Sequence, residues 1–116
     1  EWLNTQNPET LYTTAINVAE LLAGVACLPA GRRQRELGER LRATLTRLFQ
    51  GRVLFFDLSA AEAYSQIAAE SKRSGKTVPH DDGLNAAIAR ANGFAVATRN
   101  ASNFAGAGVQ VIDPWK

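Results

Sequence analysis

Two acidic residues stand where they could hold a metal ion. Glu20 closely follows a short apolar and β-branched run, and we predict that it lies in the first turn of a helix. Asp82 also stands at the predicted start of a helix. The partial positive charge at a helix N-terminus stabilises an ionised carboxylate, and carboxylate oxygens are the ligands that Mg²⁺ takes in proteins. Glu20 and Asp82 are therefore candidate ligands of a hard divalent cation.

Small residues accompany both acids. Gly24 lies one turn after Glu20, and Ala86 and Ala89 lie one and two turns after Asp82, so each carboxylate has space on its own side of the helix. The alternative is that these acids only cap helices. Glu20 would then be the second member of a capping box, and Asp81 or Asp82 would be an N-cap. Taken singly, capping is the more common role. It accounts for Asp81 better than Asp82 and gives no reason for the small residues.

A polar segment follows the predicted strand Ala95–Thr98. Its candidate site residues are Thr98, Arg99, Asn100 and Asn103. The amide oxygens of Asn100 and Asn103 could bind an ion or orient its waters, and Arg99 could contact a phosphate. The alternative is an ordinary turn, in which asparagine is common.

Short apolar or β-branched runs alternate with longer helical patterns along the chain. The strand candidates are Leu11–Ala15, Val53–Asp57, Ala95–Thr98 and Val109–Ile112. Each is nearly uniform rather than alternating, which is typical of strands buried on both faces of a parallel sheet. We therefore predict an α/β sandwich with a mainly parallel sheet, in which sites form beyond the carboxyl ends of the strands.

Start and stop signals bound the predicted helices. The first begins with a capping-box pair, Asn17 and Glu20, and carries an apolar stripe: Val18, Leu21, Leu22 and Val25. The second covers Gly31–Gln50, with a buried seam of leucines: Leu37, Leu41, Leu45 and Leu48. The third begins with Ser59 and Glu62 and ends near Gly75 and Pro79. The fourth begins at Asp81 or Asp82, ends at Asn92–Gly93, and has the stripe Leu84, Ala87, Ile88 and Ala91.

Length and composition indicate one ordinary globular domain. The chain has 116 residues, of which 46% are hydrophobic and 21% charged. No run approaches the roughly 20 apolar residues that cross a bilayer, and no secretory leader is visible, so we expect a cytoplasmic protein without membrane contact. The single cysteine, Cys27, excludes an intramolecular disulfide and a thiolate metal site. We expect Cys27 to be a small apolar filler.

Basic residues concentrate in one predicted helix. Six arginines fall within sixteen residues: Arg32, Arg33, Arg35, Arg40, Arg42 and Arg47. Such a helix could track phosphates. The favoured alternative is a solvated face with ion pairs such as Glu36–Arg40.

Four stretches, in order and with suitable spacing, resemble the VapC-type PIN-domain toxins. They are Thr14–Gly24, Asp82–Ala89, Ala97–Phe104 and Val109–Trp115. The resemblance implies a PIN-like three-layer sandwich and a metal-dependent endoribonuclease. It also implies a cognate antitoxin that neutralises the toxin, and a homodimer.

The resemblance also implies a mechanism. Glu20 and Asp82 would hold Mg²⁺ or Mn²⁺, whose bound water attacks the RNA phosphodiester. Asn100 matches the family's usual residue. The motif register favours Asp82 over Asp81 as the ligand, so we expect Asp81 to contact the substrate or the surroundings of the ion instead. His80 could contact RNA or tune the site, although a histidine in such a loop is more often only exposed to solvent.

The chain departs from the family pattern at two places. Asn103 stands where the family commonly has an aspartate. The chain also begins at Glu1-Trp2-Leu3, which resembles the helix that follows the family's first strand. We therefore expect residues 1–116 to form a single PIN-like domain without that strand and its aspartate. Two alternatives remain: a non-catalytic PIN-like module that binds an antitoxin or itself, and an unrelated small α/β protein whose acids only cap helices.

Overall fold

The computed structural model describes residues 12–97, 101–104 and 106–112. The chain divides into two compact units, and each is described by itself. The first unit, Gln6–Leu54, is called the hairpin unit. The second, Phe55–Lys116 together with Glu1–Thr5, is called the C-terminal unit.

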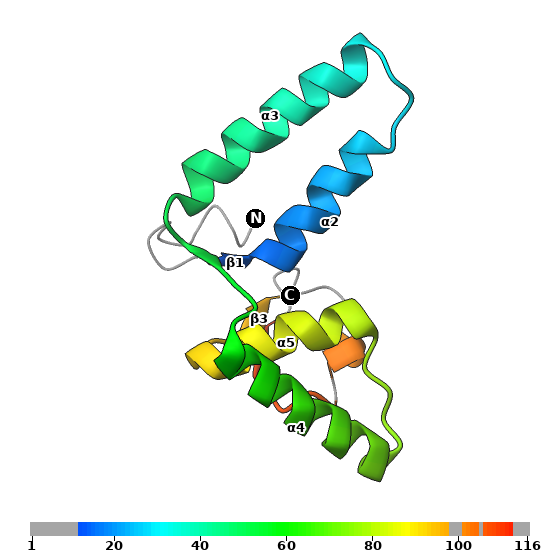
Figure 1. The fold of residues 1–116 in the computed structure, drawn as a ribbon, viewed down its shortest axis with the longest axis vertical. Helices are drawn as coiled ribbons and strands as arrows, with labels where there is room; N and C mark the ends of the chain where they lie inside the picture. Colours follow the sequence, from blue (N-terminus) through cyan, green and yellow to red (C-terminus); the bar gives the residue numbers. More distant parts are fainter. Residues whose placement is uncertain (1–11, 98–100, 105, 113–116) are drawn as a thin grey trace. The chain divides into compact units, whose positions relative to one another are not determined.

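The hairpin unit consists of two helices that follow and precede short strands. Its elements are β1 (Thr13–Thr14), α2 (Ala15–Ala26), α3 (Arg32–Phe49) and β2 (Val53–Leu54). Strands β1 and β2 pair in parallel, with Thr13 opposite Val53. Helices α2 and α3 pack against each other (Figure 1).

Helix α2 begins earlier than the sequence indicates. Thr14 is extended, and its hydroxyl accepts a hydrogen bond from the backbone N–H of Asn17 at 3.0 Å. Thr14 is therefore the N-cap, and the predicted capping box of Asn17 and Glu20 is wrong. Thr14 is also the last residue of β1, so the cap lies directly at the end of the strand. Counted from Ala15, Glu20 is the sixth residue of α2, so it lies in the second turn and not the first.

Two contacts fix α3 against α2. Gly38 is buried, and a Cβ placed there would lie 3.7 Å from Cγ1 of Val25. The side-chain amide of Gln34 donates to the carbonyls of Val25 at 3.2 Å and Ala26 at 2.8 Å. These carbonyls belong to the last turn of α2, where the regular helical partners run out, and the carbonyl of Val25 also accepts from the N–H of Leu28 at 3.1 Å. The four leucines of the predicted seam are half-buried rather than buried.

Two predictions about single residues in this unit are wrong. Glu36 forms its ion pair with Arg32, at 2.9 Å, and not with Arg40. Both pairs have the same spacing, so the sequence alone does not distinguish them. Cys27, expected as an apolar filler, is exposed, because it follows the last residue of α2 at the open end of the helix.

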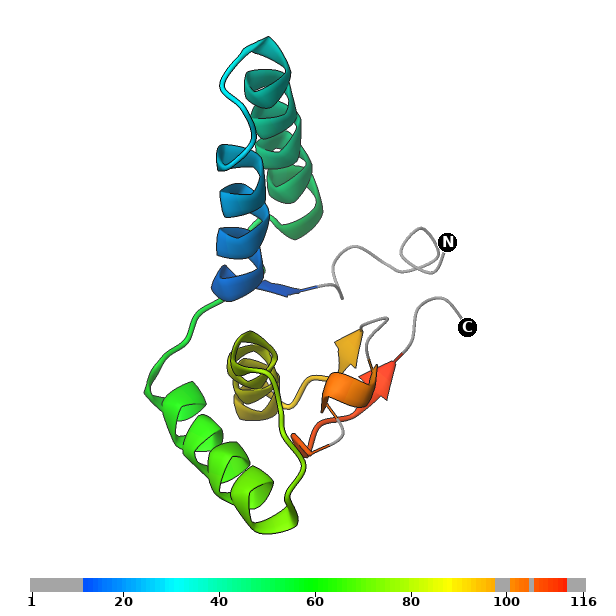
Figure 2. The same cartoon turned by 90° about the vertical axis from the view of Figure 1, so that its right-hand side faces the viewer.

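The C-terminal unit contains two longer helices and a pair of short strands. Its elements are α4 (Leu58–Ser74), α5 (His80–Asn92), β3 (Val96–Ala97), the 3₁₀ turn η2 (Ala101–Phe104) and β4 (Val111–Ile112). Strands β3 and β4 pair in parallel and lie side by side in Figure 2. Helices α4 and α5 end at Gly75 and Gly93, whose φ values of 72° and 71° suit glycine.

Helix α4 also begins with an unexpected cap. Asp57 accepts a hydrogen bond from the N–H of Ala60 at 3.0 Å, so the predicted capping box of Ser59 and Glu62 is wrong. The sequence assigned Asp57 to the end of a strand, whereas the strand β2 ends at Leu54.

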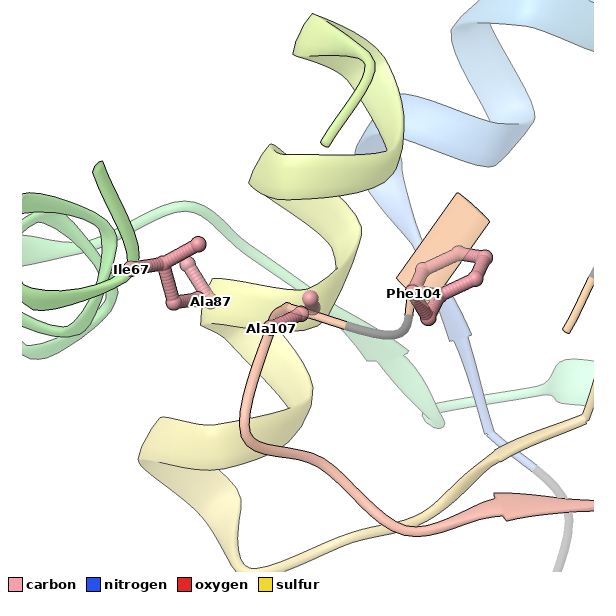
Figure 3. Close-up of a cluster of buried hydrophobic side chains, with 5 residues drawn as sticks. Ile67, Ala87, Phe104 and Ala107 are labelled. Atoms are coloured by element: carbon pink, nitrogen blue, oxygen red, sulfur yellow. The ribbon is translucent and has the colours of Figure 1, made fainter. Parts of the chain in front are cut away.

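The core of the C-terminal unit forms around α5. Ile67 of α4, Ala87 of α5, Phe104 of η2 and Ala107 pack together with Ala86 (Figure 3). Because α4 and η2 both contact α5, more than one face of this helix is buried.

The predicted stripe of α5 is therefore only partly right. Ala87 and Ile88 are buried as expected, but Ala91 is exposed and Ala89 is buried instead. A single apolar stripe describes a helix that is covered on one side, and α5 is covered on more than one.

The predicted α/β class is confirmed. Each observed strand lies within one of the four predicted ranges, both pairs are parallel, and helices separate the strands. Over the described residues, no helix is long and apolar enough to span a membrane.

Candidate metal and catalytic site

Asp82 lies in the first turn of α5 and does not cap it. The N-cap is Pro79, and no side chain makes a capping hydrogen bond at this end of the helix among the described residues. Asp81 and Asp82 are the two acids of the first turn, where the helix dipole favours a negative charge. The alternative in which either aspartate is an N-cap is therefore wrong.

The two aspartates differ in their surroundings. Asp82 is half-buried and lies in line with Ala86 and Ala89, which are 0% and 8% exposed. Asp81 is exposed, about 100° further around the helix. The predicted small neighbours thus lie on the face of Asp82, and that face is packed within the protein.

Glu20 lies on the open side of the hairpin unit. It is exposed, and it projects about 140° around α2 from Val25, the residue that faces Gly38 of α3. A Cβ built at Gly24 would meet nothing within 4 Å, so the space predicted beside Glu20 is present. Helix α3 therefore leaves this carboxylate accessible.

Three aromatic rings, those of Phe56, Tyr64 and His80, contact one another beside the first turn of α5. The hydroxyl of Tyr64 lies 3.3 Å from Nδ1 of His80, and the two rings meet edge to face with centroids 6.0 Å apart. Phe56 meets Tyr64 in the same way at 6.4 Å. A Cβ at Gly83 would approach Cε1 of Tyr64 to 3.2 Å. Tyr64 thus positions the turn that carries Asp82.

The sequence missed this role of Tyr64, which counted only as an apolar position of α4. The available signal was Gly83, because a glycine directly after Asp82 permits close approach of a neighbouring side chain.

The polar segment that follows β3 is described only in part. Thr98, Arg99 and Asn100 lie outside the described residues, so their roles stay predictions. Asn103 is half-buried in η2, and the adjacent Phe104 is 5% exposed in the core around α5. Phe104 therefore anchors η2, and with it Asn103, in the same unit as Asp82.

The donor set fits a hard cation by type. Glu20 and Asp82 offer carboxylate oxygens, and Asn103 offers an amide oxygen, which are ligands of Mg²⁺ and Mn²⁺. Within the described part of the chain, no three His, Cys, Asp or Glu residues are grouped so as to hold a metal ion. Glu20 belongs to the hairpin unit and Asp82 to the C-terminal unit, so their joint ligation stays a prediction.

The chain was compared with known protein families. Residues 1–108 match the PIN domain. The chain is 47% identical to the plasmid stability protein StbB of Pseudomonas syringae pv. tomato over 116 residues, which is 100% of this chain and 84% of that protein. It is 46% identical to the VapC ribonuclease Y4jK of Sinorhizobium fredii over 99% of this chain and 82% of that protein.

A toxin and a solved structure extend this comparison. The chain is 42% identical to the toxin FitB of Neisseria gonorrhoeae, over 98% of this chain and 82% of that protein. The crystal structure of FitAcB from the same organism matches 98% of this chain and 82% of its own chain at 42% identity, with a TM-score of 0.93. The PIN-like fold predicted from the sequence is therefore confirmed. The chain belongs to the PIN domain family, and within it the chain is a VapC-type toxin.

Proposed function

We propose that this chain is a metal-dependent endoribonuclease that hydrolyses RNA phosphodiester bonds. One observation carries the proposal. Asp82 lies half-buried in the first turn of α5, on the same face as Ala86 and Ala89, in a chain closely similar to a VapC ribonuclease. A carboxylate that does not cap its helix and is sheltered beside small residues is suited to binding a ligand.

Glu20 and Asp82 would hold Mg²⁺ or Mn²⁺ in this proposal. A divalent ion bound there supplies a more acidic water and offsets negative charge on the phosphate. Asn100 and Asn103 would orient a water or the phosphate through their amide groups. Thr98 and Arg99 would donate hydrogen bonds to phosphate oxygens. Asp81, exposed beside Asp82, would act only from outside the ligand set.

We propose two protein partners. The first is a cognate antitoxin protein that neutralises the chain, because its relatives include a toxin, FitB. The second is another copy of the chain, with which it would form a homodimer. RNA is the proposed substrate, and the proposed location is the cytoplasm.

A cleavage assay tests the proposed activity. Labelled RNA is incubated with the chain in Mg²⁺, in Mn²⁺ or in EDTA. The variants Asp82→Asn and Glu20→Gln are compared with matched controls at exposed glutamates, Glu62→Gln on α4 and Glu39→Gln on α3. We expect each ligand variant to lose roughly 100-fold or more in rate, because ligand loss removes several kcal/mol of charge stabilisation. The controls should cleave like the unchanged chain.

Two further variants sharpen the assay. Asp81→Asn should lose less activity than Asp82→Asn, because the motif register places the ligand at position 82. A chain extended at its N-terminus by a strand ending in an aspartate should cleave faster, if that acid is a third ligand. Cleavage that is equal in EDTA and Mg²⁺, or equal in all variants, would remove the nuclease proposal.

A further inference from the structure

Helix α3 carries a row of arginines that the proposed catalytic site does not use. Arg33, Arg40 and Arg47 follow one another at intervals of seven residues, and all three are exposed. Successive members are separated by a rise of about 10.5 Å and rotate by only about 20° around the helix. They form a nearly straight line about 21 Å long, called here the arginine row.

The arginine row is not neutralised by neighbouring acids. Glu36 is engaged by Arg32 at 2.9 Å. Over the residues that the structure describes, no carboxylate oxygen lies within 4.0 Å of a guanidinium of the row. Helix α3 as a whole carries six arginines and two glutamates, a net charge of +4, within a chain whose net charge is +2. The excess positive charge of the protein therefore concentrates on this helix.

Two arginines outside the row, Arg52 and Arg42, make contacts with the backbone of α3 or lie close to it. Arg52 donates to the carbonyl of Leu48 at 2.7 Å and to that of Gln50 at 3.4 Å, so it serves the last turn of α3. Arg42 folds back over Gly38, where its Nη1 atom lies 3.0 Å from the position of a Cβ. Arg47 is thus not needed to cap the helix, and all three side chains of the row stay exposed.

Helix α3, which carries the row, is held in place by its contacts with α2. Gly38 meets Val25, and Gln34 donates to the last carbonyls of α2, so α3 is anchored along the side that faces α2. The leucine seam lies about a quarter-turn away from the row. The three guanidinium groups are therefore carried at regular intervals by a helix that is held in place on another face.

We propose that the arginine row binds the phosphate backbone of the RNA substrate. Each guanidinium can donate two parallel N–H groups to phosphate oxygens. A backbone with a charge at every nucleotide offers a partner to each regularly spaced arginine, whatever the base sequence. An acidic protein segment offers carboxylates only where its sequence places them. This inference rests on the proposed ribonuclease function and gives that site a means of holding the RNA.

Salt-dependent binding tests the proposal. Binding of a labelled oligouridine is measured by fluorescence anisotropy across a range of salt, with the full chain carrying Asp82→Asn in metal-free buffer. The row variant is Arg33→Gln/Arg40→Gln/Arg47→Gln, and the matched control is Arg32→Gln/Arg35→Gln/Arg42→Gln, which removes the same charge from the same helix. A lysine version, Arg33→Lys/Arg40→Lys/Arg47→Lys, keeps the charge of the row. Circular dichroism establishes that each variant is folded.

We expect the row variant to bind more weakly and to lose about 2 from the slope of log affinity against log salt, since each single-strand phosphate contact contributes about 0.7. The control and the lysine version should keep most of the slope. An equal loss in the row variant and the control would overturn the proposal, because net charge alone would then explain binding. If the row variant lost as much slope in binding labelled polyglutamate as in binding oligouridine, RNA would be overturned as the partner and an acidic protein would be favoured.

The outcome is separable from that of the catalytic proposal. Suppose that the unchanged chain does not cleave RNA, but that the row variant alone shows a reduced salt dependence of RNA binding. The nuclease proposal then fails, and the row stands as an RNA-binding surface. If the chain cleaves RNA in metal and the row variant binds as tightly as the unchanged chain, the nuclease proposal stands and the row fails.

Discussion

At the scale of single residues, Arg90 connects three parts of the C-terminal unit. Its guanidinium donates to the carbonyl of Ala107 and to the side chain of Gln66, each at 3.3 Å, and lies 3.6 Å from Glu70. Gly108, with φ of +65°, leaves room for it, because a Cβ there would lie 3.2 Å from Nη1 of Arg90. One side chain thus joins α5 to α4 and to the turn that precedes β4.

We expect Arg90→Gln to lower the free energy of unfolding by about 1–2 kcal/mol, because hydrogen bonds to a charged donor are lost and the side chain is only partly shielded from solvent. Urea denaturation followed by circular dichroism measures the change. Arg73→Gln, an exposed arginine of α4, is the control and should leave the midpoint nearly unchanged. Equal midpoints for both variants would show that Arg90 does not hold these parts together.

At the scale of elements, the sequence located the strands and helices but misplaced their starts. Uniform apolar runs located the strands, although the strand residues are mostly half-buried rather than buried. Glycines such as Gly75 and Gly93 identify helix ends. The caps were missed because Thr14 and Asp57 were assigned to strands, although the residue that ends an extended segment is also the one that can cap the next helix.

The candidate site was predictable to a similar degree. The position of Asp82 in the first turn of its helix, and the small residues beside both acids, follow from helical spacing within one segment. Glu20 was expected in the first turn of α2 and lies in the second, because the cap at Thr14 was missed. The contact between Tyr64 and His80 does not follow from such spacing, because it depends on how α4 packs against α5. The periodicity within either helix does not specify that packing.

The residue that caps α2 is Thr14 in the structure, whereas the sequence predicted a capping box that begins at Asn17. We expect Thr14→Ala to cost about 1 kcal/mol of stability, whereas Thr14→Ser should keep the cap. Glu20→Ala should change the unfolding free energy by less than about 0.5 kcal/mol, because Glu20 is exposed in the second turn of α2 and takes no part in the cap. Chemical denaturation of the three variants gives the comparison. A larger cost for Glu20→Ala than for Thr14→Ala would restore the predicted capping box.

The close approach of α2 and α3 gives a second prediction at this scale. We expect Gly38→Ala to stabilise the chain by about 0.5–1 kcal/mol, because alanine is the better helix former and the nearest obstacle is the flexible end of Arg42. We expect Gly38→Leu to cost about 1–3 kcal/mol, since its larger side chain must displace Val25. Thermal unfolding ranks the variants. Loss of stability in both would show that the helices admit no added atom.

At the scale of the whole molecule, the family match and the proposed ion both depend on more than one part of the chain. The match to the PIN domain covers residues 1–108 and therefore includes residues of both units. The proposed ligands, Glu20 and Asp82, also come one from each unit. Binding of one ion by both acids would therefore require the complete folded chain.

We expect saturating Mn²⁺ to stabilise the folded chain by about 2.7 kcal/mol when its concentration is one hundred times the dissociation constant. Glu20→Gln and Asp82→Asn should each abolish most of this increase, whereas Glu62→Gln should keep it. Differential scanning fluorimetry in Mn²⁺ and in EDTA measures the effect. If Glu20→Gln retained the full increase while Asp82→Asn lost it, Glu20 would not be a ligand.

The exposed thiol at the end of α2 has a practical consequence for spectroscopy. Cys27 is the only cysteine of the chain, and it lies at the tip of the α2–α3 hairpin. A nitroxide or a fluorophore can therefore be attached there without removing any other thiol. A second cysteine in place of the exposed Lys72 on α4 would complete a pair of labels, one in each unit. The distance between the labels, followed during titration with Mn²⁺, RNA or an antitoxin, would report directly how the units respond to each ligand.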